Sequence, residues 1–203
     1  MSGVDAIVFD LGNVLLAFDD NIARDRMAAR TGKSPAEIES YFRSKPHVML
    51  LSLGKMPARQ FYRTVAKDLG FDGDYEEFAL IFSDIFSPID PMLKLAAGLA
   101  QRVPRLILSN TNAIHMEFVL ERFPVIQEFD DQILSHEVGL LKPDRAIYEL
   151  AAKRSGFEVG RMLFIDDLHA NVEGARGAGM RAVQFAGVEP LRQELTKLGV
   201  PII

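Results

Sequence analysis

The sequence predicts an α/β fold: a parallel sheet with helices on both faces, and a helical insertion after the first strand. Two observations carry this prediction. Short apolar runs alternate with segments of helical periodicity at the start of the chain and through its second half, which is typical of strand–helix–strand units. Between Leu15 and about Asp90 the apolar spacing is helical and shows no strand-like alternation. We therefore expect a sheet part of residues 1–15 and 91–203 and a helical insertion of residues 16–90.

The expected strands are the short apolar runs that alternate with the helical segments. In chain order, the expected strands are Ala6–Phe9, Leu106–Leu108, Gln132–Leu134, Met162–Ile165 and Ala182–Phe185.

The expected helices are marked by start and stop residues. Proline or aspartate lies near most of their beginnings, and glycine follows several of their ends. In the insertion, the expected helices are Asp20–Arg30, Pro35–Ser44, Pro57–Leu69 and Tyr75–Ile85. In the second half of the chain they are Arg145–Arg154, which Gly156 ends, and His169–Ala178, which ends at Gly179.

The composition excludes several functional classes. The 203-residue chain has no cysteine, which rules out disulfides, thiolate zinc sites and cysteine nucleophiles. Its net charge of −5 and the lack of a block of Lys and Arg give no sign of a nucleic-acid-binding surface. The first residues do not have a signal-peptide pattern, and no apolar window reaches membrane-spanning length. We expect a cytoplasmic protein with no nucleic-acid or membrane partner, and the sequence leaves its oligomeric state open.

Polar side chains follow three of the expected strands at the point where each strand ends. These residues are Asp10, Ser109 and the adjacent pair Asp166 and Asp167. Ligands of open parallel sheets bind beyond the carboxyl ends of the strands, so we expect these side chains to converge on one crevice, joined by Lys142. Each residue alone is better explained as a local cap or turn residue. Together, they favour a functional site.

The charges of such a crevice require a cation. Asp10, Asp166 and Asp167 carry three negative charges against the one positive charge of Lys142, so an anionic substrate would be repelled without a divalent ion. Oxygen ligands without a His or Cys cluster favour Mg²⁺, which binds through one or two carboxylates and substrate phosphate.

The same residue types suit phosphate chemistry. A carboxylate beside Mg²⁺ and facing phosphorus can act as a covalent nucleophile. Ser109, the backbone N–H of Asn110 and the start of the helix after Asn112 would hold the phosphate oxygens. Lys142 would neutralise the charge that grows on those oxygens in the transition state.

Four short motifs occur in a characteristic order: FDLGNVL, LILSNTN, LKP, and FIDD with Asn171 four residues after its last acid. In this order and spacing the chain resembles the haloacid dehalogenase superfamily, and the insertion resembles that superfamily's helical type 1 cap. The resemblance implies a Rossmann-like core, Mg²⁺ and a phosphoaspartyl intermediate on Asp10. The further roles that it implies are phosphate binding by Ser109 and charge stabilisation by Lys142. We expect Asp10, Asp166, Asp167 and the main-chain carbonyl of Gly12 to bind the metal.

One position departs from the superfamily pattern. Most of its phosphatases have a second aspartate where this chain has Gly12, and that aspartate protonates the leaving oxygen and later activates water. Removing a general acid/base costs on the order of a hundredfold to ten-thousandfold in rate. The Asp-Leu-Gly-Asn-Val motif nevertheless resembles a branch of type 1 capped proteins that includes sugar-phosphatases acting on glucose 1-phosphate. Asn13, His115 and a bound water are the candidates to replace the missing acid.

Three functions remain open from the sequence. The favoured one is a Mg²⁺-dependent phosphatase acting on a small phosphorylated metabolite such as a sugar phosphate. The second is a phosphate- and metal-binding protein with little or no turnover, because of Gly12. The third is a metal-free 2-haloacid dehalogenase, which the acidic pair disfavours because two acids would repel a carboxylate substrate.

Overall fold

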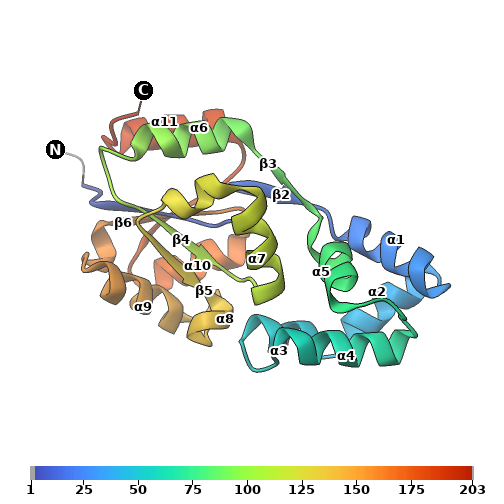
Figure 1. Cartoon of the computed structure of the whole chain (residues 1–203). Coiled ribbons are helices and arrows are strands. Elements are labelled where there is room, and N and C mark those ends of the chain that lie inside the picture. Colours follow the sequence, from blue (N-terminus) through green and yellow to red (C-terminus); the bar gives the residue numbers. More distant parts are fainter. Residues whose placement is uncertain (1–2, 203) are drawn as a thin grey trace.

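The structure, a computed structural model, describes residues 3–202 and contains a five-stranded parallel sheet in the order β5-β4-β1-β6-β7 (Figure 1). Its α/β class confirms the prediction, and each strand lies within one residue of its expected bounds. The strands are β1 (Ala6–Phe9), β4 (Arg105–Ser109), β5 (Asp131–Leu134), β6 (Met162–Asp166) and β7 (Arg181–Gln184). β1 is central and pairs with both β4 and β6.

Side chains of the sheet alternate between two apolar clusters, because successive residues of a strand point to opposite faces. In β1, Ile7 and Phe9 belong to one cluster, whereas Ala6 and Val8 belong to the other. The first cluster is covered by α6 (Asp90–Leu99), α7 (Ala113–Arg122) and α11 (Val188–Lys197). The second is covered by α9 (Arg145–Ser155) and α10 (His169–Gly177), on the opposite side of the sheet in Figure 1. Shorter elements complete this part: η1 (Pro124–Glu128), α8 (Ser135–Val138) and η2 (Val159–Arg161).

The segment between β1 and α6 forms a helical body beyond the carboxyl ends of the strands (Figure 1). Its helices are α1 (Asp20–Thr31), α2 (Pro35–Ser44), α3 (His47–Ser52), α4 (Ala58–Leu69) and α5 (Tyr75–Ser83). Of these, only α3 was not expected from the sequence. The body has its own apolar cluster, in which Phe61, Val65 and Phe78 are fully buried. Its apolar centre is therefore separate from the two clusters of the sheet.

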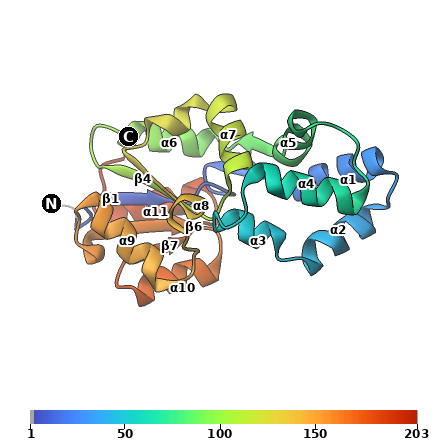
Figure 2. The same ribbon diagram turned by 60° about the horizontal axis from the view of Figure 1, so that its bottom comes forward.

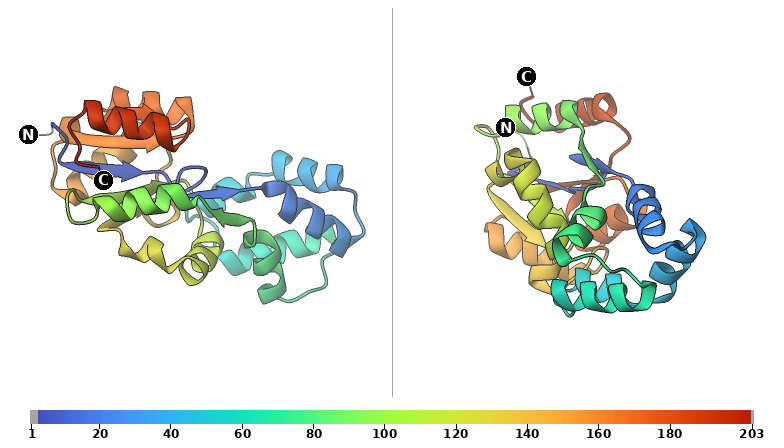
Figure 3. Two further views of the ribbon diagram at one scale, coloured as in Figure 1. Left: turned by 90° about the horizontal axis from the view of Figure 1, so that it is seen from above. Right: turned by 45° about the vertical axis from the view of Figure 1, so that its right-hand side comes forward.

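A two-stranded antiparallel ribbon joins this body to the sheet, as Figure 3 shows from above. Its strands are β2 (Leu16–Phe18) and β3 (Phe86–Pro88). The sequence did not predict the ribbon, because three residues are too few for a period of two to stand out from the helical pattern around them.

Among the described residues, the helical body also touches the sheet part beside α7 and beside α8. Ile114 of α7 is buried in the body's own apolar cluster, and the Ser83 hydroxyl donates to its carbonyl at 3.2 Å. At the other place α3 lies beside α8 (Figures 1 and 2), and a Cβ at Gly54 would be 2.1 Å from the carbonyl oxygen of His136. Gly54 also has a φ of +67°, so both its space and its backbone favour glycine.

Helix ends agree with the signals in the sequence. The Asp19 side chain accepts from the backbone N–H of Asn21 at the start of α1, and Ser34 forms a capping box with Glu37 at the start of α2. Gly32 ends α1 in the left-handed conformation. Among the described residues, no helix is both long and apolar enough to cross a membrane.

Candidate active site

Three carboxylates meet at the carboxyl ends of two neighbouring strands. Asp10 follows β1, Asp166 is the last residue of β6, and Asp167 comes directly after it. One oxygen atom of each carboxylate lies within 4.8 Å of the others. The pairing of Phe9 with Ile165 aligns the ends of β1 and β6, which explains how residues far apart in sequence come together.

Lys142 joins two of these acids. Its Nζ atom lies 2.7 Å from Oδ1 of Asp10 and 2.7 Å from Oδ2 of Asp166, and its side chain is only 1% exposed. The side-chain amide of Asn110 holds the Lys142 backbone through two hydrogen bonds of 2.8 Å, one to its carbonyl and one from its N–H. From the sequence, the backbone N–H of Asn110 was expected to bind phosphate. The sequence gave no indication that the Asn110 side chain holds the Lys142 backbone.

The Asp10 carboxylate is buried and electrostatically tuned. Burial raises its pKa to about 6; Lys142 opposes the rise, and the negative charge of Asp166 adds to it. Its Oδ1 atom accepts hydrogen bonds from the Leu11 N–H, at 2.7 Å, and from Lys142. Among residues 3–202, no side chain or backbone group donates to Oδ2. That oxygen is available to a ligand.

Asp166 and Asp167 differ in how their oxygens are used. Both oxygens of Asp166 accept from protein donors: the Leu168 N–H at 2.8 Å, the Asn171 amide at 3.0 Å, and Lys142. Asp167 accepts only a long contact of 3.4 Å from the Asn13 amide, so far as the described residues show. Asp166 is therefore committed to the protein, whereas Asp167 has free lone pairs.

The donor set suits a hard divalent cation. Asp10 and Asp167 offer carboxylate oxygens, and Gly12 lines the same cavity with its backbone. With Lys142 included, the four charged side chains carry a net charge of −2, which one Mg²⁺ ion would neutralise.

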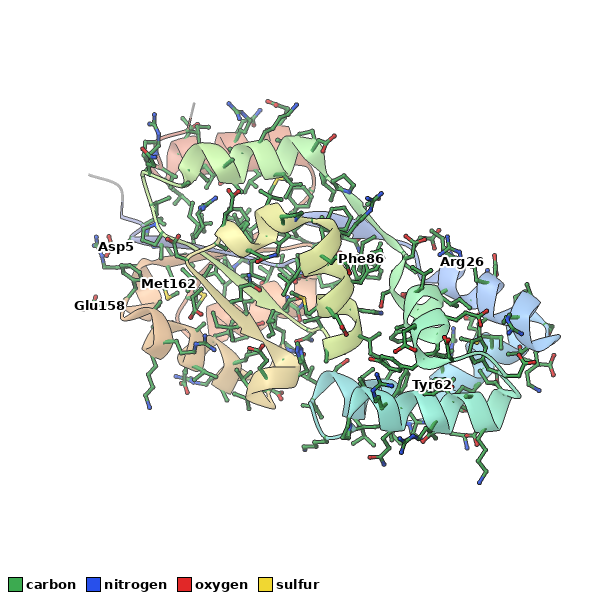
Figure 4. The ribbon with its side chains drawn as sticks, in the orientation of Figure 1. Asp5, Arg26, Tyr62, Phe86, Glu158 and Met162 are labelled. Atoms are coloured by element: carbon green, nitrogen blue, oxygen red, sulfur yellow. The ribbon has the colours of Figure 1, made fainter. Side chains whose placement is uncertain are left out.

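A cavity of about 310 Å³ opens in front of these groups. Ser109, Asn110, Thr111 and Asn112 form the part of its wall between β4 and α7. The ribbon and the helical body complete it with Phe18, Asp20, Val48, Ser52 and Phe86. Figure 4 shows Phe86 between the two parts of the molecule. Sequence reasoning missed these five residues, because which side of the insertion faces the sheet cannot be read from periodicity.

Gly12 lies under an aromatic ring. A Cβ at this position would be 2.8 Å from Cε1 of Phe18, so the Phe18 ring takes the space that a side chain at position 12 would need. Phe18 is 39% exposed and can move, but in the present arrangement an aspartate does not fit. The absence of an acid at position 12 and the position of the Phe18 ring on the ribbon are therefore sterically related.

The two side chains considered as replacements for that acid are both at the cavity. The Asn13 amide points to Asp167, and His115 lines the wall. The His115 Nε2 lies 3.2 Å from the carbonyl of Phe82, to which it donates in one tautomer, and burial lowers the pKa of the ring to about 4. A ring that is neutral near pH 7 and bound to a carbonyl is a poor proton donor.

The model of a family described as haloacid dehalogenase-like hydrolase matches residues 4–179. Phosphatase MT3486 of Mycobacterium tuberculosis is 28% identical over an alignment of 192 residues that covers 88% of this chain and 86% of the relative. D-ribitol-5-phosphate phosphatase of Bacteroides thetaiotaomicron is 27% identical over 198 residues, covering 94% of this chain and 96% of the relative.

Among solved structures, the chain is similar to the HAD family enzyme BT-2542 of Bacteroides thetaiotaomicron in complex with magnesium and inorganic phosphate. The TM-score is 0.83 and the sequence identity is 22%, over 91% of this chain and 96% of that one. At this identity the likeness establishes the fold.

Proposed function

Because the chain belongs to the haloacid dehalogenase-like hydrolase family, we propose that it is a Mg²⁺-dependent phosphatase that acts on a small phosphorylated metabolite. The main support is the arrangement of Asp10 and Lys142: a buried carboxylate with one oxygen fixed by a lysine at 2.7 Å and the other unoccupied by protein, beside a cavity. The names of the relatives that act on phosphate esters agree with this proposal.

In the proposed site, Asp10, Asp167 and the carbonyl of Gly12 would hold Mg²⁺. When bound, the ion supplies positive charge that offsets the acids and polarises the phosphoryl group. We assign Asp166 to positioning, since its oxygens are used by Lys142, Asn171 and a backbone N–H.

The phosphate would be held by the Ser109 hydroxyl, the Asn110 N–H and Lys142. The Asp10 carboxylate attacks phosphorus; an O–P bond forms while the bond from phosphorus to the ester oxygen breaks, giving a phosphoaspartyl group and the free alcohol. Water then attacks phosphorus, which releases inorganic phosphate and restores the Asp10 carboxylate. Lys142 stabilises the charge on the phosphoryl oxygens in both steps.

No side chain described at the site serves as a general acid that protonates the leaving oxygen. Gly12 cannot supply a proton, and His115 is held neutral. We therefore assign this proton to water, at a cost on the order of a hundredfold to ten-thousandfold in rate relative to a positioned acid. Because Gly12 supplies no general acid, a phosphate- and metal-binding protein with very low turnover is the second candidate function.

We propose that residues 1–15 and 91–203 act as the catalytic core and residues 16–90 as its cap. The support is that Asp10, Lys142, Asp166 and Asp167 all come from the first part, whereas Val48 and Ser52 of the second part form the facing wall.

The proposal is tested by hydrolysis of p-nitrophenyl phosphate with Mg²⁺. We expect turnover that EDTA abolishes and that Asp10→Asn removes, while Asp72→Asn, an exposed acid paired with Arg30, retains it. Activity in the Asp10→Asn variant would refute the assignment of the nucleophile. Mg²⁺ binding without turnover on a broad panel of phosphate esters would favour the binding protein, and release of chloride from 2-chloropropionate without metal would favour the dehalogenase.

A further inference from the structure

A second cavity, of about 430 Å³, lies in the helical body and adjoins the first. Asp20, Val48 and His115 line both cavities, so the two cavities share these three residues as a common wall. The remaining wall comes from α1, α2 and α5. The second cavity thus adjoins the space in which the phosphate of a ligand at Asp10 would lie.

The wall of the second cavity is mainly apolar. Its large hydrophobic side chains are Met27, Ile38, Phe42, Ile81 and Phe82. Ligand cavities lined in this way bind hydrocarbon groups by removing them from water.

The two arginines in that wall already have partners. Arg24 is paired with Asp25 at 2.8 Å, and Arg43 is paired with Glu39 on the same helix. No unpaired cation is thus offered to a second phosphate or a carboxylate by the described residues of this wall.

Two exposed hydrophobic side chains line the first cavity. They are Phe18 and Leu168, which are 39% and 56% exposed. Exposed apolar side chains at a cavity are available for contact with an apolar part of a ligand.

We propose that the substrate is a phosphate monoester with a hydrocarbon leaving group, an alkyl chain or an aromatic ring, which occupies the cavity between α1, α2 and α5. This inference rests on the proposed phosphatase function and narrows its substrate class. It separates this chain from an enzyme for polyol phosphates, because hydroxyl groups placed among Met27, Phe42 and Phe82 would lose their hydrogen bonds to water.

The experiment is a chain-length series of ethyl, butyl, hexyl and octyl phosphate, with ribitol 5-phosphate and glucose 1-phosphate as polar references. We expect kcat/KM to rise about two- to fourfold for each methylene that enters the cavity, the upper value corresponding to about 0.8 kcal/mol. The polar esters should react no faster than ethyl phosphate.

A matched pair of variants locates the effect. Ala23 lines the second cavity, whereas Ala29 lies exposed on the same helix outside both cavities. Ala23→Phe should fill the cavity and reduce the octyl-to-ethyl ratio of kcat/KM at least tenfold, and Ala29→Phe should leave that ratio unchanged. Circular dichroism checks that both variants fold, and inhibition of the wild-type enzyme by alkylphosphonates of the same lengths provides a second measurement if Ala23→Phe does not.

The outcomes separate the two proposals. Equal kcat/KM across the series, or a preference for the polar esters, would overturn the hydrocarbon subsite and leave the phosphatase intact. Alkylphosphonates that bind more tightly with chain length, without hydrolysis of any ester, would support the subsite and overturn the phosphatase.

Discussion

Replacing Lys142 by methionine should destabilise the protein strongly in the absence of metal. Lys142 is the only cation within 4 Å of Asp10 and Asp166 among the described residues, and all three side chains are at least 89% buried. Methionine keeps the length of the side chain and removes its charge. The two carboxylates, with oxygens no more than 4.8 Å apart, then face each other unscreened.

The size of the effect follows from that distance. At an effective dielectric constant of about 20, two unit charges separated by 4.8 Å repel by about 3.5 kcal/mol. Removing one partner of a buried ion pair typically costs about 3–5 kcal/mol. We therefore expect the free energy of unfolding of Lys142→Met to fall by about 3 kcal/mol or more, with part of the loss relieved by protonation of Asp10.

Urea unfolding in EDTA near pH 8 measures this loss. The matched control is Lys153→Met on α9, an exposed lysine whose replacement should change stability by less than about 0.5 kcal/mol. Adding Asp166→Asn to Lys142→Met removes one of the repelling charges and should recover at least about 1 kcal/mol. A single variant as stable as the wild type, or a double variant less stable than the single one, would refute the electrostatic reasoning.

Three further predictions concern the neighbouring residues. Gly12→Asp alone should not raise turnover, because its Cβ would be 2.8 Å from the Phe18 ring, whereas Gly12→Asp with Phe18→Ala should exceed Phe18→Ala at least tenfold in kcat on p-nitrophenyl phosphate. Burial lowers the pKa of His115 to about 4, so as the pH falls the unfolded chain binds a proton at this ring before the folded protein does. The free energy of unfolding should therefore be at its full value above about pH 6.5 and fall by up to about 3 kcal/mol towards pH 4. His115→Phe should reduce this pH dependence in urea titrations at several pH values. Asn110→Ala removes two hydrogen bonds of 2.8 Å to the Lys142 backbone and should cost about 1–3 kcal/mol in urea unfolding while also lowering kcat; unchanged values of both would contradict the positioning role.

The strands and most helices could be predicted because their signals are local. A run such as Met162–Ile165 is recognisable from its own residues, and so is a helix that begins after Ser34 and Pro35. The expectation that the residues at the strand ends are neighbours followed from one rule about parallel sheets, and the structure places Asp10, Asp166 and Asp167 together with Lys142.

What could not be predicted depends on contacts between distant segments. The Asn110 amide meets the Lys142 backbone across 32 positions of sequence, and no pattern around either residue announces this contact. The ring of Phe18 over Gly12 depends on a ribbon whose strands are too short to recognise. The second cavity depends on which faces of α1, α2 and α5 meet, which periodicity leaves undetermined.

The burial of Ile114 within the helical body bears on exchanging this body between relatives. A chimera that received residues 16–90 from another family member would have a hydrophobic centre shaped for a different side chain at position 114. It would also have a different residue at position 54, beside the His136 carbonyl. Ile114 and α8 therefore have to be transplanted along with the insertion. The set of residues that must be exchanged to preserve folding is therefore discontinuous in sequence, because it includes residues 16–90 together with Ile114 and α8, which lie in connections between strands of the sheet.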